Sequence, residues 1–138
     1  MGPTAWVVLT FRHPHSTESA DRAFHSFHNA TEKAVRSPVG YFRVLEETWS
    51  GVGTYHKTAD SPAQGCRLHI HALLYGTDNP LLNTDGNPRY TRLGSFWHYG
   101  QTWIQPYAPT RHGAQYVLKA AVSGANWDTR RLEHFTIQ

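Results

Sequence analysis

The chain has 138 residues, of which 39% are hydrophobic and 13% aromatic, which is the composition of one globular domain and not of a disordered chain. Its single cysteine, Cys66, excludes an intrachain disulfide and a multi-cysteine zinc site. The formal charge of +3 and the isoelectric point near 9.2 fit a partner that carries phosphates.

Membrane and secretion signals are also missing from the sequence. No stretch approaches the roughly 18 apolar residues that a membrane span needs, and the N-terminus lacks the basic and apolar segments of a signal peptide. We therefore expect an intracellular protein with no membrane partner.

The first half of the chain predicts a strand, a helix and a second strand. Residues 5–12 are β-branched and aromatic enough for a strand, and residues 41–49 predict another. Between them, possible caps near Ser16 and apolar residues at helical spacing predict a helix that runs to about Arg36, before the breaker SPVG. Residues 50–65 are rich in glycine and turn formers and predict a loop or an irregular hairpin extension.

The second half begins with an alternating strand at residues 67–76. Turn-forming residues follow, then a short aromatic segment at 91–100 that we expect to be helical, a strand at 101–107 and a helix that opens after Gly113. The order strand, helix, strand, strand, helix, strand, helix predicts one α+β domain over residues 1–138. We expect a central antiparallel sheet with helices mainly against one face, which leaves the other face to carry a site.

The strand at 67–76 carries the most informative feature of the sequence, the pair His69 and His71. Leu68, Ile70, Ala72 and Leu74 have one parity, and both histidines have the other. Because side chains alternate across a strand, the two imidazoles project from one face about 6–7 Å apart at the Cα level and could share one cation. Imidazole suits zinc, manganese, nickel or iron, whereas an added carboxylate favours manganese or magnesium.

Tyr116 and Lys119 lie three residues apart on the helix predicted after Gly113, so they share one face of it. They can act on one phosphate. A phenol with a pKa near 10 is a poor nucleophile until a cation or base draws off its proton, and an ammonium can stabilise the charge that builds on the attacked phosphate. A divalent ion held nearby would polarise that phosphate.

Taken together, three short motifs occur in one order along the chain: VLTF at residues 8–11, HIHALL at 69–74 and YVLK at 116–119. In this order they resemble the HUH endonucleases, specifically the replication initiators of rolling-circle plasmids and small viruses. The resemblance spans most of the chain, from about Trp6 to Lys119. It implies the HUH fold, which is related to RNA-recognition and ferredoxin-like folds.

The resemblance also implies an activity: metal-dependent, site-specific nicking and rejoining of single-stranded DNA through a 5′-phosphotyrosine intermediate. Tyr116 would be the nucleophile, Lys119 its helper, and magnesium or manganese the ion. A single tyrosine implies a one-tyrosine enzyme. The expected partners are single-stranded DNA at a replication origin, a helicase and a host polymerase, in the cytoplasm of a prokaryote or in the nucleus for a eukaryotic virus.

The family usually takes a third metal ligand from an acidic or amide residue ahead of the histidines, and here Glu46 and Glu47 stand in that place. Strand parity groups Glu47 with Tyr41 and Arg43 on what looks like the more polar side. The spacing E-x-T after Val-Leu is similar to the plasmid initiators and favours Glu46, and a bulge would reconcile the two. Glu46 is the preferred ligand and Glu47 the alternative.

The chain departs from the family in the long stretch between the glutamates and the histidines, where His56 and Lys57 could contact phosphate. The rival readings are a single-strand transposase or relaxase of the same superfamily, and a non-catalytic RRM-like module that binds nucleic acid through exposed aromatics. Trp97 and Trp103 are as compatible with a core as with base stacking, so neither is assigned to the site.

Overall fold

The computed structural model describes residues 3–49, 66–77, 91–107 and 126–132. These residues form an α+β fold with a central antiparallel sheet, as the sequence predicted, and the sheet has five strands with two helices beside it. The strands are β1 (Ala5–Thr10), β2 (Gly40–Trp49), β3 (Cys66–Tyr75), β4 (Thr102–Pro106) and β5 (Asn126–Arg130), and the helices are α1 (Thr17–Val35) and α2 (Thr91–Gly94). Within this part of the chain, no helix is long and apolar enough to cross a membrane.

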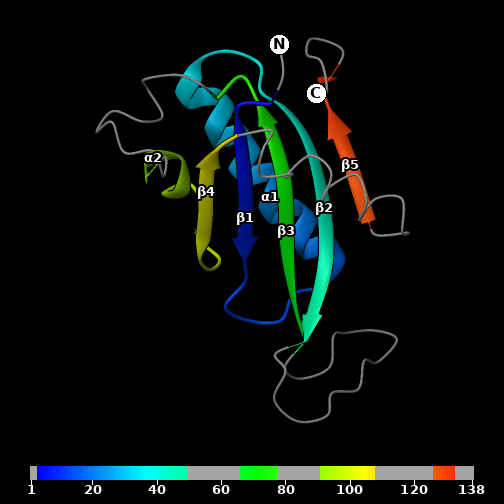
Figure 1. The fold of residues 1–138 in the computed structure, drawn as a ribbon. Helices are drawn as coiled ribbons and strands as arrows, with labels where there is room; N and C mark the ends of the chain where they lie inside the picture. The colour runs from blue at the N-terminus through cyan, green and yellow to red at the C-terminus, as the bar shows by residue number, and fades with distance from the viewer. Residues whose placement is uncertain (1–2, 50–65, 78–90, 108–125, 133–138) are drawn as a thin grey trace.

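The sheet has the order β4-β1-β3-β2-β5, with β3 at its centre. Helix α1 crosses one face of the sheet behind β1, β3 and β2, while α2 lies beside β4 (Figure 1). We call the face that α1 covers the helix face, and the opposite one the second face. No helix of the described ranges packs on the second face.

Local sequence explains where α1 begins and ends. Ser16 is the N-cap, and its Oγ accepts a hydrogen bond of 3.1 Å from the backbone N–H of Ser19. At the other end Arg36 adopts the left-handed conformation with φ 56°, and its N–H donates to the carbonyl of Glu32. The helix is thus closed at both ends by its own residues, near the limits that the sequence predicted.

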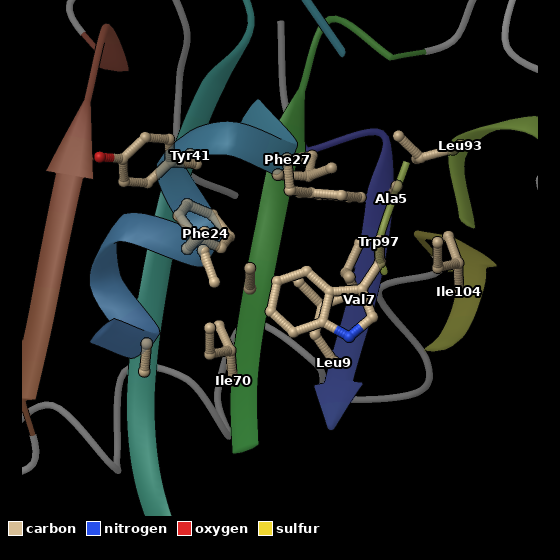
Figure 2. Packing of buried hydrophobic residues seen from close by; sticks show 14 of the residues in the cluster. Ala5, Val7, Leu9, Phe24, Phe27, Tyr41, Ile70, Leu93, Trp97 and Ile104 are labelled. Atoms are coloured by element: carbon tan, nitrogen blue, oxygen red, sulfur yellow. The ribbon is translucent and has the colours of Figure 1, made fainter. Parts of the chain in front are cut away.

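The main core lies between α1 and the helix face of the sheet. Phe24 and Phe27 of the helix pack against alternate residues of the strands, with Trp97 closing the cluster near β1 (Figure 2). Trp97 is therefore a core residue, and its Nε1–H donates to the carbonyl of Thr10 at 2.8 Å. The residues of β3 whose parity predicted burial are fully buried on this face: Leu68, Ile70, Ala72 and Leu74. Leu73 and Tyr75 of the opposite parity are also buried, in a smaller cluster with Phe42 and Val44 on the second face.

Two elements differ from the sequence-based prediction. The helix expected over 91–100 is confined to Thr91–Gly94, because the chain then turns to bring Trp97 into the core. Strand β5 was not predicted at all, since asparagine and aspartate in NWDTR disfavour a strand, yet it pairs with β2 over five residues.

Candidate metal centre

The register of β2 and β3 places Glu46 directly opposite His69 on the second face of the sheet. His71 lies two residues after His69 on β3 and shares this face, because residues i and i+2 of a strand point the same way. Residues paired across an antiparallel ladder also share a face, so the carboxylate and both imidazoles converge. The central pair of strands is what assembles this group, which we call the triad.

The distances within the triad are those of atoms that can share an ion. One carboxylate oxygen of Glu46, Oε2, lies 3.2 Å from Nε2 of His69 and 3.4 Å from Nε2 of His71. Two ligands bound to one ion at bonds of about 2.1 Å are roughly 3.0 Å apart at octahedral angles and about 3.4 Å apart at tetrahedral angles. The donor atoms all lie within 4.8 Å of one another, so the triad can hold a metal ion.

Burial keeps both imidazoles neutral, which is the form that binds a metal. Burial lowers the pKa of His69, against the opposing effect of the Glu46 carboxylate. Burial, reinforced by the neighbouring His69, lowers the pKa of His71 to about 4. Neutral imidazole is the ligating form, and at neutral pH neither ring has to lose a proton before it binds a cation.

The triad is recessed but reaches the surface. The side chains of Glu46, His69 and His71 are 25%, 18% and 12% exposed, respectively. Partial burial limits the competing water at these side chains, while their remaining exposed surface keeps them in contact with solvent. This chemistry of one carboxylate and two imidazoles suits manganese, and magnesium through its oxygen ligand.

An uninterrupted register brings Glu46 to the two histidines. Pairing runs without a break from Gly40 opposite Tyr75 to Trp49 opposite Cys66, so no bulge is needed to bring Glu46 to the histidines. Glu47 pairs with Leu68 instead of a histidine.

The side that looked more polar from the sequence is in fact buried under α1. Tyr41 and Arg43 are only 0% and 5% exposed. Arg43 donates to Asp21 of α1 at 2.7 Å and to the side-chain oxygen of Asn126 in β5 at 3.0 Å. A buried, paired arginine has the sequence signature of a surface one, and this explains why parity alone favoured Glu47.

A second group with metal-binding residue types, formed by Asp21, His25 and Asp128, lies on the helix face near β5. Here the carboxylates already have partners. Arg43 pairs with Asp21, and the Tyr41 hydroxyl donates to Asp128 at 2.8 Å. Burial and the Asp128 carboxylate raise the pKa of Tyr41, so its phenol keeps the proton that it donates. We interpret this group as an ion-pair and hydrogen-bond network that ties β5 to α1.

The remaining residues singled out in the sequence lie outside the described ranges. These are the predicted nucleophile Tyr116, its neighbour Lys119, and the loop residues His56 and Lys57. Their positions relative to the triad stay predictions.

Sequence reasoning missed two exposed aromatic residues on the face of the triad. Trp103 of β4 and Trp127 of β5 are the large hydrophobic residues that remain exposed among the described ones. The sequence is compatible with Trp103 in a core or on the surface, and it gives no sign of Trp127 because no strand is predicted there. The alternation of QTWIQPY, with Ile104 buried and its neighbours polar or aromatic, was the available signal for Trp103.

Comparison with protein-family models, with curated proteins and with solved structures finds no match to this chain.

Proposed function

We propose that this chain is a metal-dependent endonuclease and strand transferase that nicks and rejoins single-stranded DNA at a replication origin of a plasmid or virus. The observation that supports it is the triad: a glutamate and two histidines that the central strands bring within 3.2–3.4 Å on one face of an antiparallel sheet. The basic charge of the chain supports a phosphate-bearing substrate. The order of the motifs VLTF, HIHALL and YVLK supports the nicking chemistry.

In this proposal Glu46, His69 and His71 hold a manganese or magnesium ion. When bound, the ion supplies Lewis acidity at a non-bridging oxygen of the scissile phosphate. The protein's own residues hold the phosphate in place and keep the site partly shielded from water, through the recessed position of the triad.

Tyr116 is the nucleophile. Its phenol loses its proton as its oxygen bonds to phosphorus, and the bond from phosphorus to the 3′-oxygen breaks, so that this oxygen takes up a proton and leaves as a 3′-hydroxyl. Lys119 stabilises the negative charge that develops on the phosphate. The 5′-phosphotyrosine link conserves the phosphodiester energy, and attack by the 3′-hydroxyl reverses the reaction, so no nucleotide cofactor is consumed. A polymerase and a helicase would use the exposed 3′-end.

The first test addresses cleavage. The protein is incubated with manganese and a pool of single-stranded oligonucleotides of random sequence, and the products are separated under denaturing conditions. We expect a covalent protein–DNA adduct in the wild-type protein and none in Tyr116→Phe. An adduct that persists in Tyr116→Phe, or a wild-type protein that binds DNA but never forms one, contradicts the proposal.

The second test addresses the triad and uses the two adjacent glutamates as a matched pair. Glu46→Gln removes a ligand charge, and we expect manganese binding, measured by calorimetry, to weaken by more than the roughly 10- to 100-fold that the loss of an outer-shell partner costs. Glu47→Gln makes the same chemical change at the adjacent residue, and we expect it to leave the affinity for manganese unchanged. Equal losses in both variants would place the ion elsewhere.

A second candidate function has a specific observation in its favour. The exposed Trp103 and Trp127 on the sheet suit a module that binds nucleic acid without cutting it. Such a module gives the DNA complex but no adduct in the first test.

A further inference from the structure

Trp103 and Trp127 stand out because each exposes about half of a large aromatic side chain, 47% and 54% respectively. They lie on β4 and β5, the two edge strands of the sheet. Both belong to the second face, since Trp103 pairs with Val8 and Trp127 with Val44, and both of these valines pair with His71.

This register places the two tryptophans at opposite ends of a single row across the sheet. The row reads Trp103, Val8, His71, Val44, Trp127, one residue from each strand. Neighbouring strands are about 4.8 Å apart, so each tryptophan begins roughly 10 Å to one side of the central histidine. The triad lies midway between two exposed indole rings.

Both rings are held in place by an aromatic neighbour from the next row. Trp6 packs edge-on against Trp103 with ring centroids 5.3 Å apart, and Phe42 stacks on Trp127 at 5.8 Å with an angle of 23°. Trp6 and Phe42 are themselves paired with the same residue of β3, Leu73. A fixed ring loses little conformational entropy when a flat ligand stacks on it.

We propose that Trp103 and Trp127 form a split stacking platform, on which bases of a single DNA strand stack on either side of the triad. Single-stranded DNA is the occupant that these features favour. Its bases match exposed indole faces, its backbone matches the basic charge of the chain, and a phosphate between the two stacked segments would lie at the triad. This inference rests on the proposed function for the identity of the ligand, but it does not require cleavage.

The platform would contribute to the affinity for single-stranded DNA and to the position of the strand over the triad. It would not recognise a particular base sequence. Every base has a stacking face, so two indole rings bind bases with little preference among them. Their contribution is to fix which phosphate lies over the triad, because the strand is held on both sides of it.

The test is DNA binding without metal. Binding of fluorescent oligothymidylate of about 16 nucleotides is measured by anisotropy in EDTA, so that the triad makes no contribution. We expect Trp103→Leu and Trp127→Leu, which keep apolar bulk but lose the ring, each to weaken binding by about 5- to 100-fold. Trp103→Phe and Trp127→Phe, which keep a ring, should lose much less. Manganese affinity and thermal unfolding report whether each variant is folded.

The outcomes separate this inference from the proposed function. If folded leucine variants bind oligothymidylate as the wild type does, the platform is refuted, whether or not Tyr116 forms an adduct. A second outcome is that the leucine variants lose binding and the phenylalanine variants keep it, while the wild type forms no adduct with any DNA. This outcome supports the stacking platform and contradicts the proposed nuclease activity. A wild-type protein that binds no single-stranded DNA overturns both.

Discussion

His28 shows how a single side chain can tie the stability of this protein to pH. Its ring is buried between α1 and β2, where Nε2 lies 2.7 Å from the carbonyl oxygen of Val39. Burial lowers the pKa of His28, and this effect outweighs the opposing hydrogen bond to Val39 and the charge of Glu32. The folded protein therefore holds a neutral imidazole there at neutral pH.

This lowered pKa predicts a loss of stability in acid. The unfolded chain binds a proton at His28 near its ordinary pKa of about 6.5, whereas the folded chain resists it until lower pH. The contribution of His28 is thus fully present above about pH 6.5 and declines as the pH falls below it. We expect the free energy of unfolding in urea to fall less between about pH 7.5 and 5.5 in His28→Gln than in the wild type.

The comparison with the wild type is needed because the pKa values of His69 and His71 are also lowered. Both histidines therefore add to the loss of stability in acid. An identical pH dependence in His28→Gln would show that His28 contributes nothing to it.

At this scale the sequence could predict which way residues face only where one face is uniformly apolar. The alternation around His69 and His71 satisfied that condition, and the structure bears it out. For β2 this condition was not met, because Arg43, which is buried against Asp21, cannot be told from an exposed arginine in the sequence. That pairing depends on a residue 22 positions away in the chain, on α1.

The connection from α2 to β4 packs closely against the backbone at the end of β1 at Gly100. A methyl group added to Gly100 would overlap the carbonyl oxygen of Thr10, at the end of β1. The backbone here is also hydrogen-bonded to β1, since the N–H of Thr10 donates to Gln101 and that of Arg12 to Tyr99. The backbone of β1 therefore has little freedom to move away.

Gly100→Ala should destabilise the fold by about 1–3 kcal/mol, because backbone atoms must shift to make room. Gly94→Ala is the matched control: there the added group would meet the side-chain oxygen of Thr102 at 2.9 Å, which can rotate away, and alanine favours the helix. Thermal unfolding of the two variants measures the difference. Equal melting temperatures would mean that the β1 contact yields as easily as a side chain.

Elements with a strong periodicity could be predicted from the sequence. Elements that depend on packing against other parts of the chain could not. The periodicity of α1 and β3 and the cap at Ser16 are local signals, so their limits could be predicted to within a residue or two. Strand β5 has no such signal and exists through its pairing with β2. The short extent of α2 likewise follows from the burial of Trp97, which no local pattern specifies.

For the whole molecule, the excess of basic residues predicts how DNA binding responds to salt. Each phosphate that the protein neutralises releases counterions, so the logarithm of the affinity for single strands should fall linearly with the logarithm of the salt concentration, by about 0.7 per contact. Trp127→Leu removes no charge, so it should lower the affinity at every salt concentration without changing this slope. Anisotropy titrations over a salt series measure both quantities. A slope that is flat, or that changes in Trp127→Leu, would contradict this division of roles.

The three proposed metal ligands come from β2 and β3, which are consecutive in the chain and adjacent at the middle of the sheet, whereas the two tryptophans come from five-residue strands at its margins. Among the described residues each marginal strand pairs with one neighbour, and segments with fewer packed neighbours open at a lower free energy. Local opening of β4 or β5 would therefore release stacked bases while β2 and β3 still hold the proposed metal ion. Capture of the ion and capture of the strand are in this way separable steps, with the ion held by the more durable part of the protein.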